Sequence, residues 1–231
     1  MAVTFFPYFS LQEEILLMNQ TNYAASWIKT GAVCGLLSMV VYFAAAFAPL
    51  PPLATYVAAF AFGPMLAIGC AGLFYFLIND DFSPRVTIAT VSGVAAGIML
   101  LLMLTVQQSS FATMEKHTGT GNEDIKAGYK YITDGLNSVH FGMDIAWDIL
   151  ISIATILYGY SLLKKTIYWK VLGIVGSLLG LLLLSFNLYH FPTPPESAGS
   201  IDWGPFVAIW YIVLFSSITS LLLRKKVFKA A

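Results

Sequence analysis

The amino-acid sequence predicts an all-α, polytopic membrane protein with six transmembrane helices in one domain, residues 1–231. Hydrophobic residues make up 58% of the chain and charged residues only 10%, whereas a soluble domain carries about 25% charged residues. Mean hydropathy is +0.77. Six apolar stretches each reach the roughly 20 residues that a helix needs to cross the hydrocarbon of a bilayer. No basic tract indicates nucleic-acid binding, so the lipid bilayer is the expected partner.

The segment before the first span carries a signal for a helix start. Ser10 to Glu13 reads S-L-Q-E, the pattern of a capping box, and the apolar run E-I-L-L-M follows it. We therefore expect a short N-terminal interfacial helix. A secretory signal begins with a basic region, whereas the first basic residue here is Lys29, so we expect the first span to stay uncleaved.

The six apolar stretches are separated by breaks that contain prolines or charged residues. The predicted spans are approximately 28–48, 53–78, 86–106, 143–162, 171–190 and 203–223. Glycines recur four residues apart within three of these spans, a spacing that lets helix backbones approach closely in lipid. These glycines are Gly31 and Gly35, Gly93 and Gly97, and Gly176 and Gly180.

The polar loop at 107–136 contains a helical pattern of its own. Asn122 is a plausible N-cap, and apolar residues recur at helical spacing at Ile125, Tyr129, Ile132 and Leu136. This pattern predicts an amphipathic helix on the outer surface that leads into the fourth span. The alternative is a solvated loop in which the pattern arises by chance.

Lysine and arginine predict the orientation of the chain in the membrane. Nine basic residues lie on the side that holds both termini, and three lie on the other side, namely Lys116, Lys126 and Lys130. By the positive-inside rule, both termini are expected in the cytoplasm. The basic residues of the first group are Lys29, Arg85, Lys164, Lys165, Lys170, Arg224, Lys225, Lys226 and Lys229.

A polar stripe marks the fourth span. His140, Asp144, Asp148 and Ser152 are spaced four residues apart, so they lie on one slowly drifting face of a helix. A carboxylate at the centre of a bilayer costs about 2.5–3.5 kcal/mol even on a lenient insertion scale. The stripe is therefore expected to face the bundle interior or water, and no lysine or arginine is expected to be buried in a span where it could pair with the stripe.

The fifth span ends in two further polar residues, Asn187 and His190. A short link, K-K-T-I-Y-W-K, joins spans four and five, so the two spans are expected to be antiparallel neighbours. Counted from their lysines, Asn187 and His190 lie at about the depth of Asp144 and His140. If the stripe faces the fifth span, His190 is expected within side-chain reach of His140 or Asp144.

Three roles fit these residues. His140, Asp144 and His190 offer nitrogen and oxygen ligands for a transition metal such as zinc. Alternatively, Asp144 and Asp148 attract a cation or share a proton in an outward-opening vestibule. The polar groups could also satisfy one another and only hold the bundle together. No HExxH, GxSxG or phosphate-loop motif favours catalysis.

The second half of the chain resembles a group of small bacterial six-span membrane proteins of unknown function. The resemblance covers about a third of the chain and is carried by D-x-x-W-D in span four and N-L-x-x-F-P-T-P-P after span five. It implies a location in the bacterial inner membrane. Membrane ceramidases and progestin/adiponectin-receptor-like hydrolases also place His and Asp ligands for zinc on their spans. They have seven spans and an HxxxH motif in the last one, and this sequence has neither.

Three functions follow as hypotheses. The first is transport or binding of a small molecule or cation, with Asp144 and Asp148 as charge-bearing groups and His140 as a pH-sensitive residue. The second is a metal-dependent membrane hydrolase that acts on a lipid or amphiphile, with His140, Asp144 and His190 as ligands and Asp148 as base. The third is a non-catalytic accessory or sensor protein.

Overall fold

The computed structural model describes residues 7–78, 80–117, 123–193, 195 and 197–230, and within them every regular element is an α-helix. Each helix contains a segment that is long and apolar enough to cross a membrane. The protein is therefore a multi-pass integral membrane protein. The helices are α1 (Pro7–Phe47), α2 (Pro52–Ile78), α3 (Pro84–His117), α4 (Glu123–Leu162), α5 (Ile167–His190) and α6 (Gly204–Ala230).

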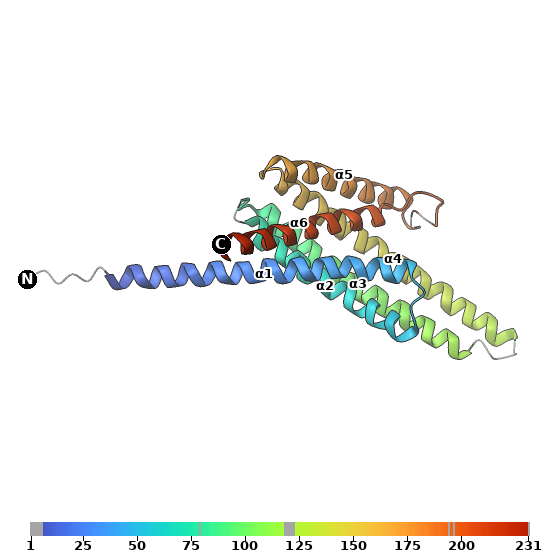
Figure 1. Cartoon of the computed structure of the whole chain (residues 1–231). Helices are drawn as coiled ribbons and strands as arrows, with labels where there is room; N and C mark the ends of the chain where they lie inside the picture. The colour runs from blue at the N-terminus through green and yellow to red at the C-terminus, as the bar shows by residue number, and fades with distance from the viewer. Residues whose placement is uncertain (1–6, 79, 118–122, 194, 196, 231) are drawn as a thin grey trace, which may run out of the picture.

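The helices form one bundle in chain order. Each helix packs against the next one along the chain, and α6 also packs against α1, which closes the bundle. Figure 1 shows α1 beginning and α6 ending at the same end of the bundle. The first turns of α1 project beyond the bundle at that end, and the last turns of α3 and first turns of α4 project beyond it at the opposite end. At about 1.5 Å per residue, the 40 residues of α4 reach about 60 Å, twice the thickness of the hydrocarbon core.

Prolines mark where several helices begin. Pro52 and Pro84 are the first residues of α2 and α3, where a missing backbone N–H removes no intrahelical bond. At the start of α6, a carboxylate oxygen of Asp202 accepts a 2.7 Å hydrogen bond from the Gly204 N–H. This bond satisfies one of the unpaired donors of the first turn.

The predicted glycines lie where helices cross. A Cβ added at Gly31 would sit 2.4 Å from the Cα of Gly72, and one added at Gly97 would sit 2.6 Å from the Gly63 carbonyl oxygen. Side chains larger than hydrogen are excluded there because the neighbouring atoms belong to the backbone. Small residues thus bring α1 against α2, and α2 against α3, at van der Waals distance.

Both flanking segments are helical as predicted, but neither is a separate element. Residues 10–18 lie within the single helix α1, because no proline or glycine interrupts the chain between residues 8 and 30. Similarly, α3 continues to His117, so most of the predicted loop at 107–136 is helix. The predicted outer-surface helix is the exposed first part of α4, and its proposed N-cap, Asn122, lies outside the described residues.

Candidate functional site

The polar stripe of α4 runs from a half-exposed end into the centre of the bundle. His140 and Asp144 are half-buried, Asp148 is 5% exposed, and Ser152 is completely buried. The stripe therefore turns toward the other helices and away from lipid, as the desolvation of a carboxylate requires. This orientation follows from the spacing of four residues, which keeps all four side chains on one face.

A partly open cavity of about 520 Å³ lies over His140, Asp144 and Asp148 of this stripe, at the end of the bundle opposite the two termini. Its carboxylates come from Asp144 and Asp148 on α4 and from Asp202 just before α6. No lysine or arginine is among the described residues that line it. The other polar lining residues are Thr55, Gln107, Gln108 and His140, and the aromatic ones are Tyr42, Phe62 and Trp147.

Asp148 connects this cavity to α5. The Nδ2 atom of Asn187 donates a 2.8 Å hydrogen bond to Oδ2 of Asp148, and a second bond of 3.0 Å to the Leu183 carbonyl. Asn187 is only 1% exposed, so the amide–carboxylate bond is shielded from water. The structure thus places one of the two polar residues from the end of α5 against the stripe.

His190 lies elsewhere. Its Nε2 atom is 2.8 Å from the hydroxyl oxygen of Ser200, and its ring packs edge-on against Tyr189 at 4.9 Å between centroids. Gly199 has a φ of 75°, a turn conformation that glycine adopts without strain, and it directs Ser200 back toward the end of α5. His190 does not line the cavity that His140 lines.

The predicted zinc ligands do not form a cluster. Across the described residues, no three His, Cys, Asp or Glu side chains are grouped closely enough to hold a metal ion, and this includes the set of His140, Asp144 and His190. Nε2 of His140 is buried and has no hydrogen-bond partner. The imidazole is thus placed at the cavity without a second histidine beside it.

A second, smaller void of about 20 Å³ adjoins the cavity deeper in the bundle, and Tyr42, Phe62 and Trp147 line both. A space of this size holds roughly one water molecule. Below it the polar groups continue: the hydroxyl oxygens of Thr155 and Tyr211 are 3.2 Å apart, and both residues are fully buried. These two hydroxyl groups lie beneath a void whose own lining is mainly apolar, with Met39, Leu66 and Ile151 among its side chains.

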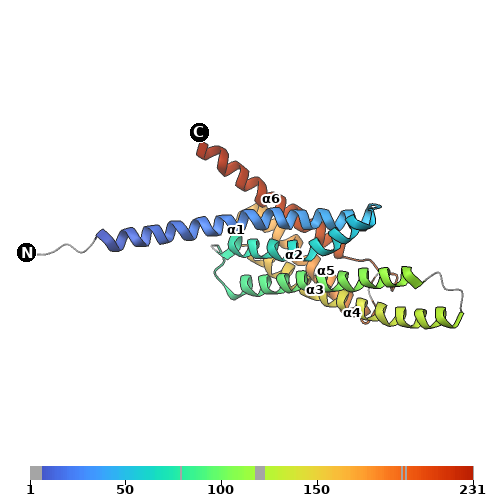
Figure 2. The ribbon, with the colours of Figure 1, turned by 90° about the horizontal axis from the view of Figure 1, so that it is seen from below.

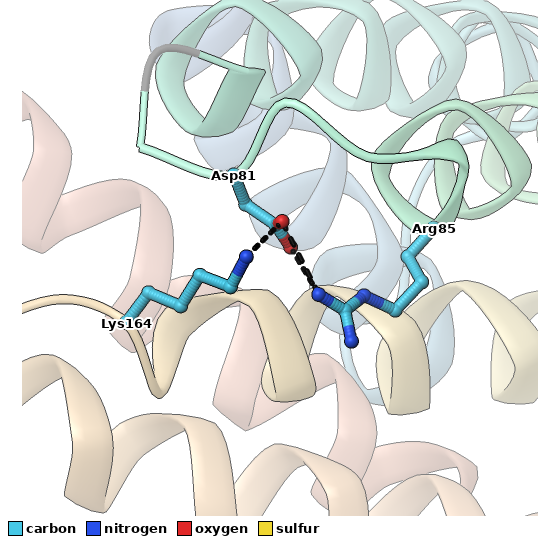
Figure 3. Close-up of polar contacts among 3 residues, drawn as sticks. All are labelled: Asp81, Arg85 and Lys164. Carbon is cyan, nitrogen blue, oxygen red and sulfur yellow. Dashed lines mark hydrogen bonds and ion pairs between the residues drawn. The ribbon is translucent and has the colours of Figure 1, made fainter.

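The opposite end of the bundle has a second group of charges, shown in Figure 3. Asp81, in the connection between α2 and α3, is only 1% exposed. Its Oδ1 atom accepts hydrogen bonds from Nζ of Lys164 at 2.5 Å and from the guanidinium of Arg85 at 3.2 Å. A neighbouring, more exposed pair joins Asp80 to Lys165. These contacts fasten the α2–α3 connection to the end of α4.

The electrostatics of Asp81 follow from its partners. Burial by itself raises the pKa of the carboxyl group, but the hydrogen bonds from Lys164 and Arg85 outweigh burial and hold its pKa well below the usual range. The sequence identified this segment only as a polar break between spans. The partners Asp81 and Lys164 are 83 residues apart, so no local pattern could have joined them.

Several cavity residues were also missed by sequence reasoning. Trp147 occurs in the D-x-x-W-D pattern but was not assigned a role, and its buried Nε1 atom has no hydrogen-bond partner. Tyr42, Thr55 and Phe62 come from apolar spans where single aromatic or hydroxyl residues are common. Their presence at the cavity depends on how α1 and α2 are rotated, which the sequence does not specify.

Comparisons with known proteins return no match: no family model, no curated protein and no solved structure is similar to this chain.

Proposed function

We propose that this protein binds a small organic cation in the cavity and transports it across the membrane. The observation that carries the proposal is the composition of the cavity wall, which has three carboxylates and no lysine or arginine among its described residues. Carboxylates held in a low-dielectric region lower the free energy of a bound cation. The same groups would repel an anion.

The size and the walls of the cavity favour an organic cation over a bare metal ion. Its volume of about 520 Å³ lies within the range of roughly 300–1,000 Å³ that is typical of small-molecule pockets. Tyr42, Phe62 and Trp147 supply aromatic rings, whose faces attract cations by about 0.5–2 kcal/mol. A cation with apolar substituents can use both the carboxylates and these rings.

The orientation belongs to the same proposal. The distribution of lysine and arginine supports cytoplasmic termini, and the resemblance supports the inner membrane of a bacterium. The cavity then opens outward, while the contacts of Asp81 close the cytoplasmic end. A reporter fused after Ala231 is expected to read as cytoplasmic, and one inserted between α3 and α4 as external.

Binding is tested with the purified full-length protein in detergent, using guanidinium and tetraethylammonium as cations and urea as the neutral analogue of guanidinium. At constant ionic strength, a bound cation raises the melting temperature in a saturable way; a ligand at 100 times its Kd stabilises by about 2.7 kcal/mol. Urea is not expected to give this saturable increase. Uptake into proteoliposomes then distinguishes transport from binding alone.

The matched variants are Asp148→Asn and Asp134→Asn. Both remove one carboxylate from α4, but Asp148 lines the cavity and Asp134 is exposed on the projecting part of the helix. Asp148→Asn is expected to weaken cation binding at least about tenfold, the effect of one charged contact. Asp134→Asn is expected to bind like the wild type. Equal affinity of the Asp148→Asn variant and the wild type would contradict the proposal.

A further inference from the structure

A second candidate binding site lies at the other end of the bundle, between the start of α5 and the second half of α6. A cavity of about 610 Å³ is lined there by Tyr168 and Trp169 on α5 and by hydroxyl and cationic side chains on α6. The polar residues of α6 in this wall are Ser216, Ser217, Ser220 and Arg224. Figure 2 shows the end of α6 diverging from the other helices.

This polar cavity continues into an apolar one. A groove of about 360 Å³ runs further along the same two helices, lined by Val171, Val175 and Leu179 of α5 and by Phe206 and Ile209 of α6. Tyr168 and Val213 line both cavities, so the two form one continuous groove.

The residues of α6 along the groove are ordered by polarity. Phe206, Ile209, Val213, Ser217, Ser220 and Arg224 are spaced three or four residues apart, which places them on one helix face. The face changes from apolar to hydroxyl-bearing to cationic toward the end of α6. The apolar part lies within the candidate span Gly204–Arg224, and Arg224 ends it at the membrane boundary.

An amphiphile with an apolar chain and an anionic headgroup matches this sequence of apolar, hydroxyl-bearing and cationic side chains. The groove wall has hydroxyl donors and one guanidinium, and no carboxylate is among its described lining residues. A guanidinium recognises a phosphate through two parallel hydrogen bonds, while serine hydroxyls donate to its remaining oxygens. Basic pockets between transmembrane helices are a known setting for acidic lipid headgroups.

We propose that this groove holds one anionic phospholipid, with its phosphate at Arg224 and Ser220 and an acyl chain along Val213, Ile209 and Phe206. An anionic lipid is favoured over a zwitterionic one because the guanidinium of Arg224, the cationic group of the groove wall, repels a choline group. The site is separate from the cation cavity in position and in chemistry, so it does not depend on the function proposed above.

The test measures lipid retention by the full-length protein after purification in detergent. Delipidated protein is incubated with equal amounts of phosphatidylglycerol and phosphatidylcholine of the same chain length, and native mass spectrometry counts the lipids that remain bound. The wild type is expected to retain one phosphatidylglycerol in clear preference to phosphatidylcholine. A hydrogen bond to a charged group contributes about 1.5–3 kcal/mol, so Arg224→Gln is expected to lower the retention of phosphatidylglycerol roughly tenfold or more.

Two further variants separate the groove from general surface charge. Lys170→Gln removes an exposed basic residue of α5 that does not line the groove, and it is expected to retain lipid within about twofold of the wild type. Val213→Trp fills the junction of the two cavities. Since Val213 is 41% exposed, this variant is expected to keep the wild-type melting temperature and helical circular dichroism while losing the lipid.

Three results would overturn the proposal. The first is equal retention of phosphatidylglycerol and phosphatidylcholine by the wild type. The second is an equal loss of lipid in Lys170→Gln and Arg224→Gln, which would indicate diffuse surface electrostatics. The third is full displacement of the lipid by millimolar glycerol 3-phosphate, which would identify a site for a soluble phosphate that does not need the acyl groove.

Discussion

The two ends of the bundle both bury aspartate, but they surround it with opposite chemistry. At the end near the termini, Asp81 is held by Lys164 and Arg85. At the other end, Asp148 receives a neutral amide from Asn187 and lines a cavity without lysine or arginine in its described wall. One carboxylate is neutralised within the protein, and the other contributes negative potential to a space that a ligand can enter.

This contrast separates a structural role from a binding role. Two cations around Asp81 compensate its burial, and the three side chains join the α2–α3 connection to the end of α4 (Figure 3). The amide of Asn187 orients the Asp148 carboxylate without placing a positive charge beside it. Asp81 thus joins two parts of the bundle, whereas Asp148 is the residue proposed to bind a cation.

Removal of the Asp81 carboxylate is expected to have the largest effect on stability. In Asp81→Asn, Lys164 and Arg85 lose their common acceptor, and a hydrogen bond to a charged group contributes about 1.5–3 kcal/mol. The side chains of Arg85 and Lys164 are 35% and 45% exposed, so water partly solvates both cations after the carboxylate is removed. We expect a loss of about 2 kcal/mol in the free energy of unfolding, measured by SDS titration in mixed micelles. An unchanged midpoint would show that the contacts are not stabilising.

A comparison of the wild type with Asp81→Asn at different pH values gives a second prediction. Since the folded state holds the pKa of Asp81 below its unfolded value of about 3.9, its stabilisation is complete above that value and is lost as pH falls toward the folded pKa. The difference between the wild type and Asp81→Asn should therefore be constant between pH 6 and 8 and shrink below about pH 4. Melting curves at several pH values measure it, and a difference that grows toward acid would contradict the assignment.

The Asp148–Asn187 bond is expected to contribute less. Its donor is neutral, which limits the coupling energy to about 1–2 kcal/mol. A double-mutant cycle with Asp148→Ala and Asn187→Leu measures this energy, because each substitution removes the hydrogen bond. In the control cycle, Asp134 is mutated in place of Asp148. Asp134 is exposed on the projecting part of α4 and should show no coupling to Asn187. Equal coupling in both cycles would mean that the bond is not specific.

The six apolar helices could be predicted from sequence because apolar length is a local property. Where the helices end could not be predicted as well, because a helix does not have to stop at the membrane surface. Thus α1 and α4 extend through the segments that were predicted as separate helices. In α1 no proline or glycine between residues 8 and 30 indicates a break, whereas α4 stays helical through Gly128, Gly135 and Gly142, so glycine alone does not mark a helix end.

The candidate site was predictable only where one helix carried it. The spacing of His140, Asp144 and Asp148 placed the three on one face without knowledge of any other helix. His190 could not be placed in this way, because it lies at the end of α5, where the following turn brings Ser200 to its ring. Likewise, the partners of Asp81 come from distant parts of the chain, and sequence reasoning had used Lys164 only to predict orientation.

The smallest effect is expected for the second ion pair near the termini, Asp80 with Lys165. Asp80 has 47% of its side chain exposed, so water screens the pair, and exposed pairs contribute about 0.2–1 kcal/mol. Lys165 also lies 4.1 Å above the centre of the Phe76 ring and keeps that contact when Asp80 is changed. Asp80→Asn should therefore lower the free energy of unfolding by less than about 1 kcal/mol, and 0.5 M NaCl should reduce the difference further. If Asp80→Asn instead destabilised the protein as much as Asp81→Asn, the two neighbouring aspartates would share one network, and burial would not explain a larger contribution of Asp81.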